Sequence, residues 1–288
     1  MSSGNKKSAQ RVQVLSQALP YIQEFSGKIF VVKYGGSAME SPLLKKDSIR
    51  DFVLLSYVGI KLVIIHGGGP EISQMSKQLN LPVKFVQGHR VTDSKTMEVV
   101  EMVLVGKVQK DLVNLINVSG ARAIGLCGKD GKLFSAKPAR GMKKYGYIGE
   151  VDKIDISVLI SLIDTGFIPV ISSVGADHKG QNYNINADTV ASKIASALSA
   201  EKLFLITDTP GILKQPDKYS SLISKLSIKD ATKLIKNKTI SGGMIPKTNA
   251  AIEAVKSGVH AVHIIDGRVK HSILLETFTD SGIGTMIV

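Results

Sequence analysis

Short apolar runs rich in β-branched residues recur along the chain, and each is followed closely by glycine. Between these runs apolar residues recur at helical spacing, and residues 94–118 predict one long helix packed on the core. The alternation predicts an α/β fold of the αβα sandwich type, with an open, mainly parallel central sheet and helices on both faces. The predicted strands cover residues 29–33, 62–66, 167–172, 203–207 and 261–265.

Two segments depart from this alternation. Residues 126–152 are rich in glycine and lysine, which predicts hairpins that project from the sheet. Before Lys28, apolar residues fall on one helical face while Pro20 removes a hydrogen-bond donor midway. We expect a kinked N-terminal helix there, packed either on its own subunit or against a second subunit.

Glycine-rich turns fall into two groups, one before residue 90 and one after residue 184. We therefore expect two lobes built on one sheet, an N-terminal lobe at 28–180 and a C-terminal lobe at 181–288. The segment 1–27 stands apart as a predicted oligomerisation helix. With 288 residues and 43% hydrophobic content, the chain can bury one substantial core.

Composition narrows the classes of partner. Lysine and arginine number 37 against 24 aspartates and glutamates, a net charge of +13 that suits anionic ligands. The lysines are scattered, arginine is scarce and tryptophan is absent, so we expect no nucleic acid as the main partner. No apolar run approaches the roughly 20 residues that span a bilayer, so we expect no membrane segment.

The single cysteine, Cys127, lies in an apolar stretch and predicts a buried thiol rather than a nucleophile. One cysteine cannot form an internal disulfide, which favours a reducing compartment. The polar, lysine-bearing start of the chain lacks the pattern of a signal or transit peptide. We expect a cytoplasmic protein, or one of the chloroplast stroma if a plastid encodes it.

Two glycine-rich turns follow predicted strands. The first is Lys-Tyr-Gly-Gly-Ser at 33–37 and the second is His-Gly-Gly-Gly-Pro at 66–70. Such turns let backbone amides approach phosphate oxygens, and Pro70 can begin a helix whose N-terminus favours anions. Two glycines after a strand are more often only a tight turn, so either motif alone is weak evidence. Two of them on neighbouring strands indicate a phosphate cradle. The cradle residues are Gly35, Gly36 and Gly67.

Three further motifs supply polar groups. Tyr-Asn-Ile-Asn-Ala-Asp at 183–188 precedes a helical stretch, where its side chains could either cap the helix or bind a ligand. Gly-Gly-Met-Ile-Pro-Lys at 242–247 places Lys247 in a first helical turn, against the helix dipole, which suits a polyphosphate partner or a solvated surface. Arg90 could clamp a carboxylate bidentately or form a structural ion pair.

Two lysines, glycine-rich turns and an Asn/Asp pair fit phosphoryl transfer to a carboxylate. This nucleophile is ionised at neutral pH and needs no general base, whereas the charge on the transferring oxygens must be stabilised. We therefore interpret His66 as a structural hydrogen-bonding residue. The chain has neither the Walker A pattern nor the dinucleotide-binding glycine pattern, which argues against a P-loop NTPase and against a Rossmann dehydrogenase.

Five motifs in this order, at 32–36, 66–70, 88–92, 183–188 and 242–247, resemble the amino acid kinase family, in particular its N-acetylglutamate kinases, over residues 28–288. The resemblance implies transfer of the γ-phosphoryl group of ATP to the side-chain carboxylate of N-acetyl-L-glutamate, with Mg²⁺ carried by the phosphates and no protein metal site. Acetylaminoadipate, glutamate or UMP as the substrate, or a non-catalytic arginine-sensing scaffold, remain alternatives.

The same resemblance implies roles for individual residues. In this interpretation the N-terminal lobe binds the acyl amino acid and the C-terminal lobe binds ATP, with amides of Gly36 and Gly68 on the phosphoryl group. The implied residues are Lys33, Lys247 and Asp188 for catalysis; Gly68, Gly69, Arg90 and Asn184 for the substrate; and Thr207, Asp208, Gly211 and Gly243 for the nucleotide.

The kinked helix and the C-terminal stretch resemble the arginine-inhibited branch of these kinases. That resemblance implies a homo-oligomer, a dimer or a ring-like hexamer in which the helix joins dimers. It also implies L-arginine as an inhibitor and, in photosynthetic lineages, the PII signalling protein as a partner. The residues it places near an arginine pocket are Tyr21, Lys214, Glu276 and Gly282.

Overall fold

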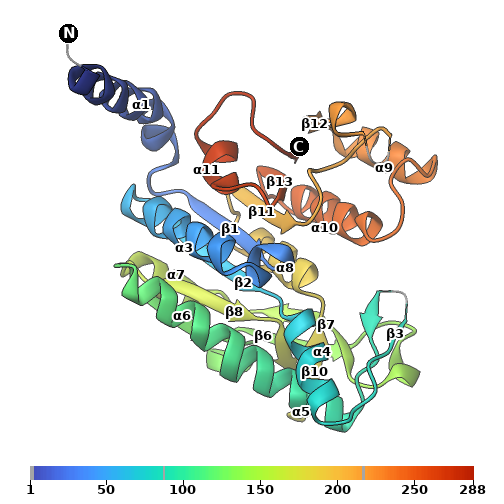
Figure 1. Ribbon diagram of the computed structural model, residues 1–288. Coiled ribbons are helices and arrows are strands. Elements are labelled where there is room, and N and C mark those ends of the chain that lie inside the picture. Colours follow the sequence, from blue (N-terminus) through green and yellow to red (C-terminus); the bar gives the residue numbers. More distant parts are fainter. Residues whose placement is uncertain (1–2, 87, 216–217) are drawn as a thin grey trace.

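An eight-stranded sheet forms the centre of the computed structural model, which describes residues 3–86, 88–215 and 218–288 (Figure 1). Its strand order is β12-β14-β13-β11-β1-β2-β8-β5, and only the β13–β14 pair is antiparallel. The predicted α/β class and mainly parallel sheet are therefore confirmed. The strands are β1 (Ile29–Tyr34), β2 (Lys61–His66), β5 (Ala123–Leu126), β8 (Ile168–Ser172), β11 (Lys202–Thr207), β12 (Lys225–Leu226), β13 (Ala261–Asp266) and β14 (Thr285–Ile287).

Helices cover both faces of this sheet (Figure 1). One face carries α2 (Ser37–Glu40), α3 (Pro42–Tyr57), α5 (Ser94–Glu101), α6 (Gln109–Val118) and α11 (Ser272–Thr277). The other face carries α7 (Ser157–Asp164), α8 (Ala187–Ala197), α9 (Ile228–Lys236) and α10 (Met244–Lys256). The central strands are apolar on both sides, as expected of parallel strands covered on both faces.

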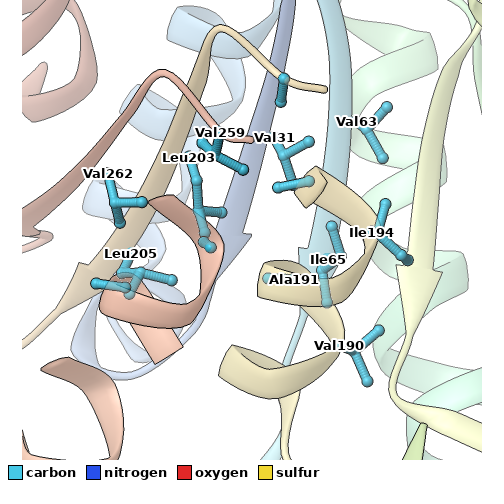
Figure 2. Close-up of a cluster of buried hydrophobic side chains, with 14 of the residues drawn as sticks. Val31, Val63, Ile65, Val190, Ala191, Ile194, Leu203, Leu205, Val259 and Val262 are labelled. Carbon is cyan, nitrogen blue, oxygen red and sulfur yellow. The ribbon is translucent and has the colours of Figure 1, made fainter. Parts of the chain in front are cut away.

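Alternate residues of β1 enter two separate cores. Val31 is fully buried on the α8 face, while Phe30 and Val32 are fully buried on the α3 face. Figure 2 shows Val31 and its cross-strand neighbours Val63 and Leu203 packed over the α8 residues. Burying such side chains stabilises the fold by about 2 kcal/mol each, so the two cores hold β1 firmly at the centre.

A small closed barrel lies beside the main sheet. It contains β6 (Phe134–Pro138), β7 (Ile148–Ile154), β9 (Val174–Ala176) and β10 (Asn182–Ile185). The antiparallel β6–β7 pair confirms the predicted hairpin at 126–152. The other two strands were not predicted. A separate short pair, β3 (Phe85–Val86) and β4 (His89–Arg90), follows α4 (Gly69–Gln78).

The long helix predicted at 94–118 is present as one continuous helical segment, but its middle has a geometry that the apolar spacing did not predict. Between α5 and α6 the chain forms a π-helix, η1 (Met102–Val108). In an α-helix, residues five apart point about 140° away from each other, whereas the wider turn of i→i+5 bonding brings them toward the same side of the helix. The wider turns let both Leu104 and Gln109 face inward, where Gln109 Nε2 donates to the carbonyls of Leu126 (2.6 Å) and Val170 (3.1 Å).

The N-terminal helix α1 (Ser3–Phe25) projects from the rest of the molecule and contains Pro20 (Figure 1). Its last residue, Phe25, is buried and its ring packs edge-on against Phe30. Val12 and Leu19 are 63% and 50% exposed. The helix is confirmed, while its kink, its role in oligomerisation and the division into lobes at residue 180 stay predictions.

Two smaller expectations concern the thiol and the membrane. Cys127 is buried, and burial raises the pKa of its thiol to about 11, as an inert core cysteine would have. Within the ranges that the structure describes, no helix has the length and apolar character that crossing a bilayer requires.

Candidate active site

A cavity of about 230 Å³ opens at the carboxyl ends of β1 and β2. These strands are adjacent and parallel, so the turns that follow them meet at one edge of the sheet. The segment after β10 and the first turn of α8 complete the cavity from the opposite side. Nine of the predicted residues line it: Lys33, Gly35, Gly36, Gly67, Gly68, Gly69, Arg90, Asn184 and Asp188.

Two lysines share one carboxylate at this site. Lys33 Nζ lies 3.3 Å from Asp188 Oδ1, and Lys247 Nζ lies 2.8 Å from Asp188 Oδ2. The three side chains are 14%, 9% and 15% exposed for Lys33, Lys247 and Asp188, so little water screens them. The arrangement is a nearly buried cluster with one excess positive charge.

Electrostatics at the cluster favour the ionised carboxylate. Burial raises the pKa of Asp188, but the charges of Lys33 and Lys247 overcome burial and hold the pKa at about 2. Burial lowers the pKa of Lys247, although Asp188 opposes that change.

Asn186, rather than Asp188, caps α8: its side chain accepts hydrogen bonds from the amides of Asp188 and Thr189. Asp188 is therefore left to hold the two lysines.

The glycine turns leave little room for a side chain at two positions. A Cβ at Gly35 would lie 3.2 Å from Lys33 Nζ, and one at Gly68 would lie 2.6 Å from Leu104 Cδ2. The second contact comes from the π-helix η1, so the unusual helix directly shapes the cavity wall. Pro70 lies in the first turn of α4, as predicted. The backbone amides at the N-terminus of α4 can bind an anion.

Arg90 and Asn184 lie on the cavity wall. Arg90 donates from one terminal nitrogen to the Gly69 carbonyl (2.8 Å) and to Ser73 Oγ (2.7 Å). Its other terminal nitrogen is buried and has no hydrogen-bond partner among the described residues, nor does any acidic side chain there form an ion pair with it. The alternative of a structural ion pair is thus not found. Asn184 Nδ2 donates to Thr92 Oγ1 (3.3 Å).

A second cavity of about 320 Å³ lies beyond the lysine pair, between the loop after β11 and the start of α10. Asp208 and Gly211 line it as predicted, whereas Thr207 ends β11 and Gly243 precedes α10 without lining it. Sequence reasoning missed Tyr219 and Arg268 on its wall. The Arg268 guanidinium is held by Asp266 (2.8 Å) and donates to the Tyr219 hydroxyl (3.0 Å).

The structure brings together some of the residues predicted for an arginine pocket. The Glu276 carboxylate is buried, bonded to His263 Nδ1 (2.7 Å), and lies close behind Gly282. Tyr21 donates to Asp280 on the same C-terminal loop. Lys214 is exposed on the loop after β11, where its backbone amide donates to the Ser221 carbonyl (3.0 Å).

Two relatives that align with nearly the whole of this chain carry the same name. An acetylglutamate kinase of Thermosynechococcus vestitus is 58% identical over 278 residues, covering 96% of this chain and 94% of the relative. The chloroplastic acetylglutamate kinase of Arabidopsis thaliana is 53% identical over 288 residues, covering 100% of this chain and 83% of that protein.

Among solved structures, N-acetylglutamate synthase from Neisseria gonorrhoeae superimposes with a TM-score of 0.84 at 28% identity, in a complex with coenzyme A and N-acetyl-glutamate. Its complex with coenzyme A and L-arginine gives 0.79 at 27% identity. The match covers 96% of this chain in both cases, but this chain spans only 63% and 65% of the synthase.

Residues 28–266 match the amino acid kinase family, and this span contains the first cavity, the lysine pair and every lining residue of the second cavity except Arg268. The matched span begins just before β1 and ends with β13, so it takes in the central strands that carry the site. On sequence and fold together, this chain belongs to the amino acid kinase family.

Proposed function

We propose that the protein transfers the γ-phosphoryl group of ATP to the side-chain carboxylate of N-acetyl-L-glutamate, giving N-acetyl-L-glutamyl 5-phosphate and ADP. The observation that carries this proposal is the pair of lysines on Asp188 at the mouth of an anion-ready cavity. Identity of 53–58% to acetylglutamate kinases over nearly the full length supports the same substrate.

In this proposal the protein supplies charge and position. The substrate carboxylate attacks the γ-phosphorus and the bond to the bridging oxygen of ADP breaks, so no proton moves. Lys33 and Lys247 neutralise the transferring oxygens, and Asp188 keeps the two ammonium groups apart and aligned. The amides of Gly36 and Gly68 donate to the same group.

The acyl amino acid occupies the first cavity. The unpartnered nitrogen of Arg90 binds the carboxylate remote from the reaction, because a guanidinium can hold a carboxylate in a fixed orientation. Gly69 and Asn184 bind the rest of the substrate. A glutamate without the acetyl group, or a longer dicarboxylic acid, would leave polar groups of this cavity unpaired or misplace the reacting carboxylate.

The nucleotide occupies the second cavity, with Thr207, Asp208, Gly211 and Gly243 near it. Within the described ranges, no three His, Cys, Asp or Glu side chains cluster in a way that could hold a metal ion. Asp188 is committed to two lysines. In this proposal Mg²⁺ is bound by the triphosphate and arrives with it as part of the substrate. The division into an acyl-binding lobe (28–180) and an ATP-binding lobe (181–288) belongs to the same proposal.

The test is to incubate purified protein with MgATP and N-acetyl-L-glutamate and trap the acyl phosphate with hydroxylamine. We expect turnover with this acid above acetylaminoadipate and free glutamate, and loss of turnover in folded Lys33→Ala and Lys247→Ala variants. Wild-type rates in both variants would contradict the mechanism. Turnover of UMP in place of any acid would contradict the substrate.

Regulation and assembly form a further part of the proposal. The exposed Val12 and Leu19 on the projecting helix α1 suit a contact between subunits, which supports a hexamer of three dimers. L-arginine would inhibit, and the PII protein would bind, as the resemblance implies. Deleting residues 1–25 should then leave dimers and remove arginine inhibition; an unchanged hexamer by light scattering would refute the role of the helix.

The compartment is proposed from the relatives alone. The relative from Arabidopsis thaliana is a chloroplastic protein and the one from Thermosynechococcus vestitus is cyanobacterial, so the chloroplast stroma suits a plastid-encoded chain and the cytoplasm a bacterial one. Fractionation of the native source would separate the two.

A further inference from the structure

His66 ends β2 directly beneath the first cavity and is completely buried. Its Nδ1 lies 2.9 Å from the carbonyl oxygen of Gly67. A carbonyl can only accept, so Nδ1 must carry the proton and Nε2 must be bare. Burial lowers the pKa of the imidazole to about 4, so the ring stays neutral near pH 7. His66 therefore presents one N–H, and it is used on the neighbouring peptide.

That hydrogen bond fixes the plane of the peptide that joins Gly67 to Gly68. The Gly67 amide already donates to the Tyr34 carbonyl (3.1 Å), so the peptide before it is fixed as well. In a trans peptide the C=O and the following N–H point in opposite directions. Because the Gly67 carbonyl turns toward the buried imidazole, the Gly68 amide turns away from it, and Gly68 lines the cavity.

The free amide and its support fit a ligand site. In the part of the chain that the structure describes, the Gly68 amide donates to no other protein group. Leu104 packs against Gly68 from the other side, where even a Cβ would be too close. Without the imidazole, two adjacent glycines could rotate their shared peptide at little steric cost.

His66 also retains an unfavourable feature. Its Nε2 is buried without a partner among the described residues. Leaving a buried polar atom unpaired is costly, and an aliphatic side chain at the end of this apolar strand would avoid that cost. The hydrogen bond from Nδ1 to the Gly67 carbonyl, which holds the glycine turn in place, explains why a histidine occupies this position.

We infer that His66 is a positioning residue: through the Gly67 carbonyl it aims the Gly68 amide at the transferring phosphoryl group. This inference rests on the proposed function. His66 itself exchanges no proton and touches no substrate. Its contribution appears when charge develops on the phosphoryl oxygens, because a preoriented donor needs no rearrangement at that moment.

The experiment compares three variants by the hydroxylamine assay. Asn in His66→Asn places its side-chain N–H near the position of Nδ1, whereas Gln in His66→Gln reaches the position of Nε2, and His66→Leu has no donor. Ser172→Ala is the matched control, since Ser172 is the buried residue paired with His66 on β8 and its hydroxyl has no partner among the described residues. Folding is checked by circular dichroism and thermal melting.

We expect the kcat of the Gln and Leu variants to fall about 10- to 100-fold, with KM for ATP within about twofold of wild type. The Asn variant should return to within about threefold of the wild-type kcat, and Ser172→Ala should match wild type. A merely structural histidine predicts instead that all three variants lose thermal stability while the folded fraction keeps its kcat.

Equal kcat in the folded Gln and wild-type enzymes would overturn the inference, as would equal losses in the Asn and Gln variants. If the Gln and Leu variants do not fold, the Asn variant decides: a loss beyond tenfold in folded protein contradicts the role, and near-wild-type kcat supports it. Failure of the proposed function is distinct, because the wild-type enzyme would then form no acyl phosphate.

Discussion

The charge cluster at residues 33, 188 and 247 allows a prediction about the single substitution Asp188→Asn. The change keeps the shape of the side chain and removes its charge. Two nearly buried ammonium groups would then face each other without a counter-ion. We expect both a loss of stability and a loss of catalysis.

The pKa of Asp188 gives the size of the stability effect. Its value of about 2 lies below the ordinary 3.8, and one pKa unit corresponds to about 1.4 kcal/mol, so the ionised form contributes about 2.5 kcal/mol to folding. A depressed carboxyl pKa stabilises the fold above the unfolded-state value and loses this effect as pH falls through the folded-state value. The stability gap between wild type and Asn variant should thus be full at pH 7 and shrink as pH falls from about 4 toward 2.

The assay is urea unfolding at pH 7 and at acid pH, followed by circular dichroism. The matched control is Asp164→Asn, because Asp164 pairs with Lys61 at 2.7 Å but the side chains are 52% and 37% exposed. Such a surface pair should contribute only about 0.5 kcal/mol. In the hydroxylamine assay we expect kcat of Asp188→Asn to fall at least about 100-fold.

Two results would refute this reasoning. An Asp188→Asn variant that loses less than about 1 kcal/mol at pH 7 would show that the lysines do not depend on the carboxylate. Equal losses in the two Asp→Asn variants would show that burial of the cluster does not matter.

Three further predictions address other parts of the molecule. Arg90→Lys should raise KM for N-acetylglutamate about tenfold with KM for ATP nearly unchanged, because lysine cannot span two acceptors; equal changes in both KM values would contradict this. Burial raises the pKa of Asp51 to about 6, against the opposing effect of His271. Protonated Asp51 therefore stabilises the fold fully below about pH 4, and this stabilisation is lost as pH rises through 6. Asp51→Asn should therefore gain stability relative to wild type between pH 4 and 7, by up to about 3 kcal/mol in urea unfolding, and a constant difference would refute it. Gly282→Ala should lower the unfolding free energy by about 1 to 2 kcal/mol, since φ is +58° and the new Cβ would lie 2.7 Å from Glu276 Oε2; an unchanged melting temperature would contradict the strain.

The sequence predicted those parts of the fold in which a local pattern coincides with burial. The strands that end at Tyr34 and His66 are apolar on both faces and are followed by glycines, so their ends and the first cavity could be placed from sequence. The strands β9 and β10 could not, because three or four residues carry too little periodicity. Their pairing depends on the barrel that forms around them.

The π-helix and the second cavity escaped prediction for a different reason. The π-helical turn is needed because Leu104 and Gln109 both contact residues of other elements. The spacing of apolar residues along the helix does not reveal these contacts. Tyr219 and Arg268 meet across 49 positions of the chain, with no shared motif. A charged residue just after a strand, as in Asp-Gly-Arg at 266–268, is the signal that could have been noticed.

The position of β1 at the middle of the sheet has a consequence for how the chain is made. One neighbour, β2, follows within 27 residues of Tyr34, but the other, β11, starts only at Lys202. At about 5 to 20 residues per second, a ribosome needs roughly ten to thirty seconds to reach it. Throughout that time the nascent chain carries an apolar strand with one unsatisfied edge, the kind of surface that recruits chaperones or aggregates. Slow steps and rescue by chaperones should therefore dominate the biogenesis of this protein more than that of a helical bundle of equal length.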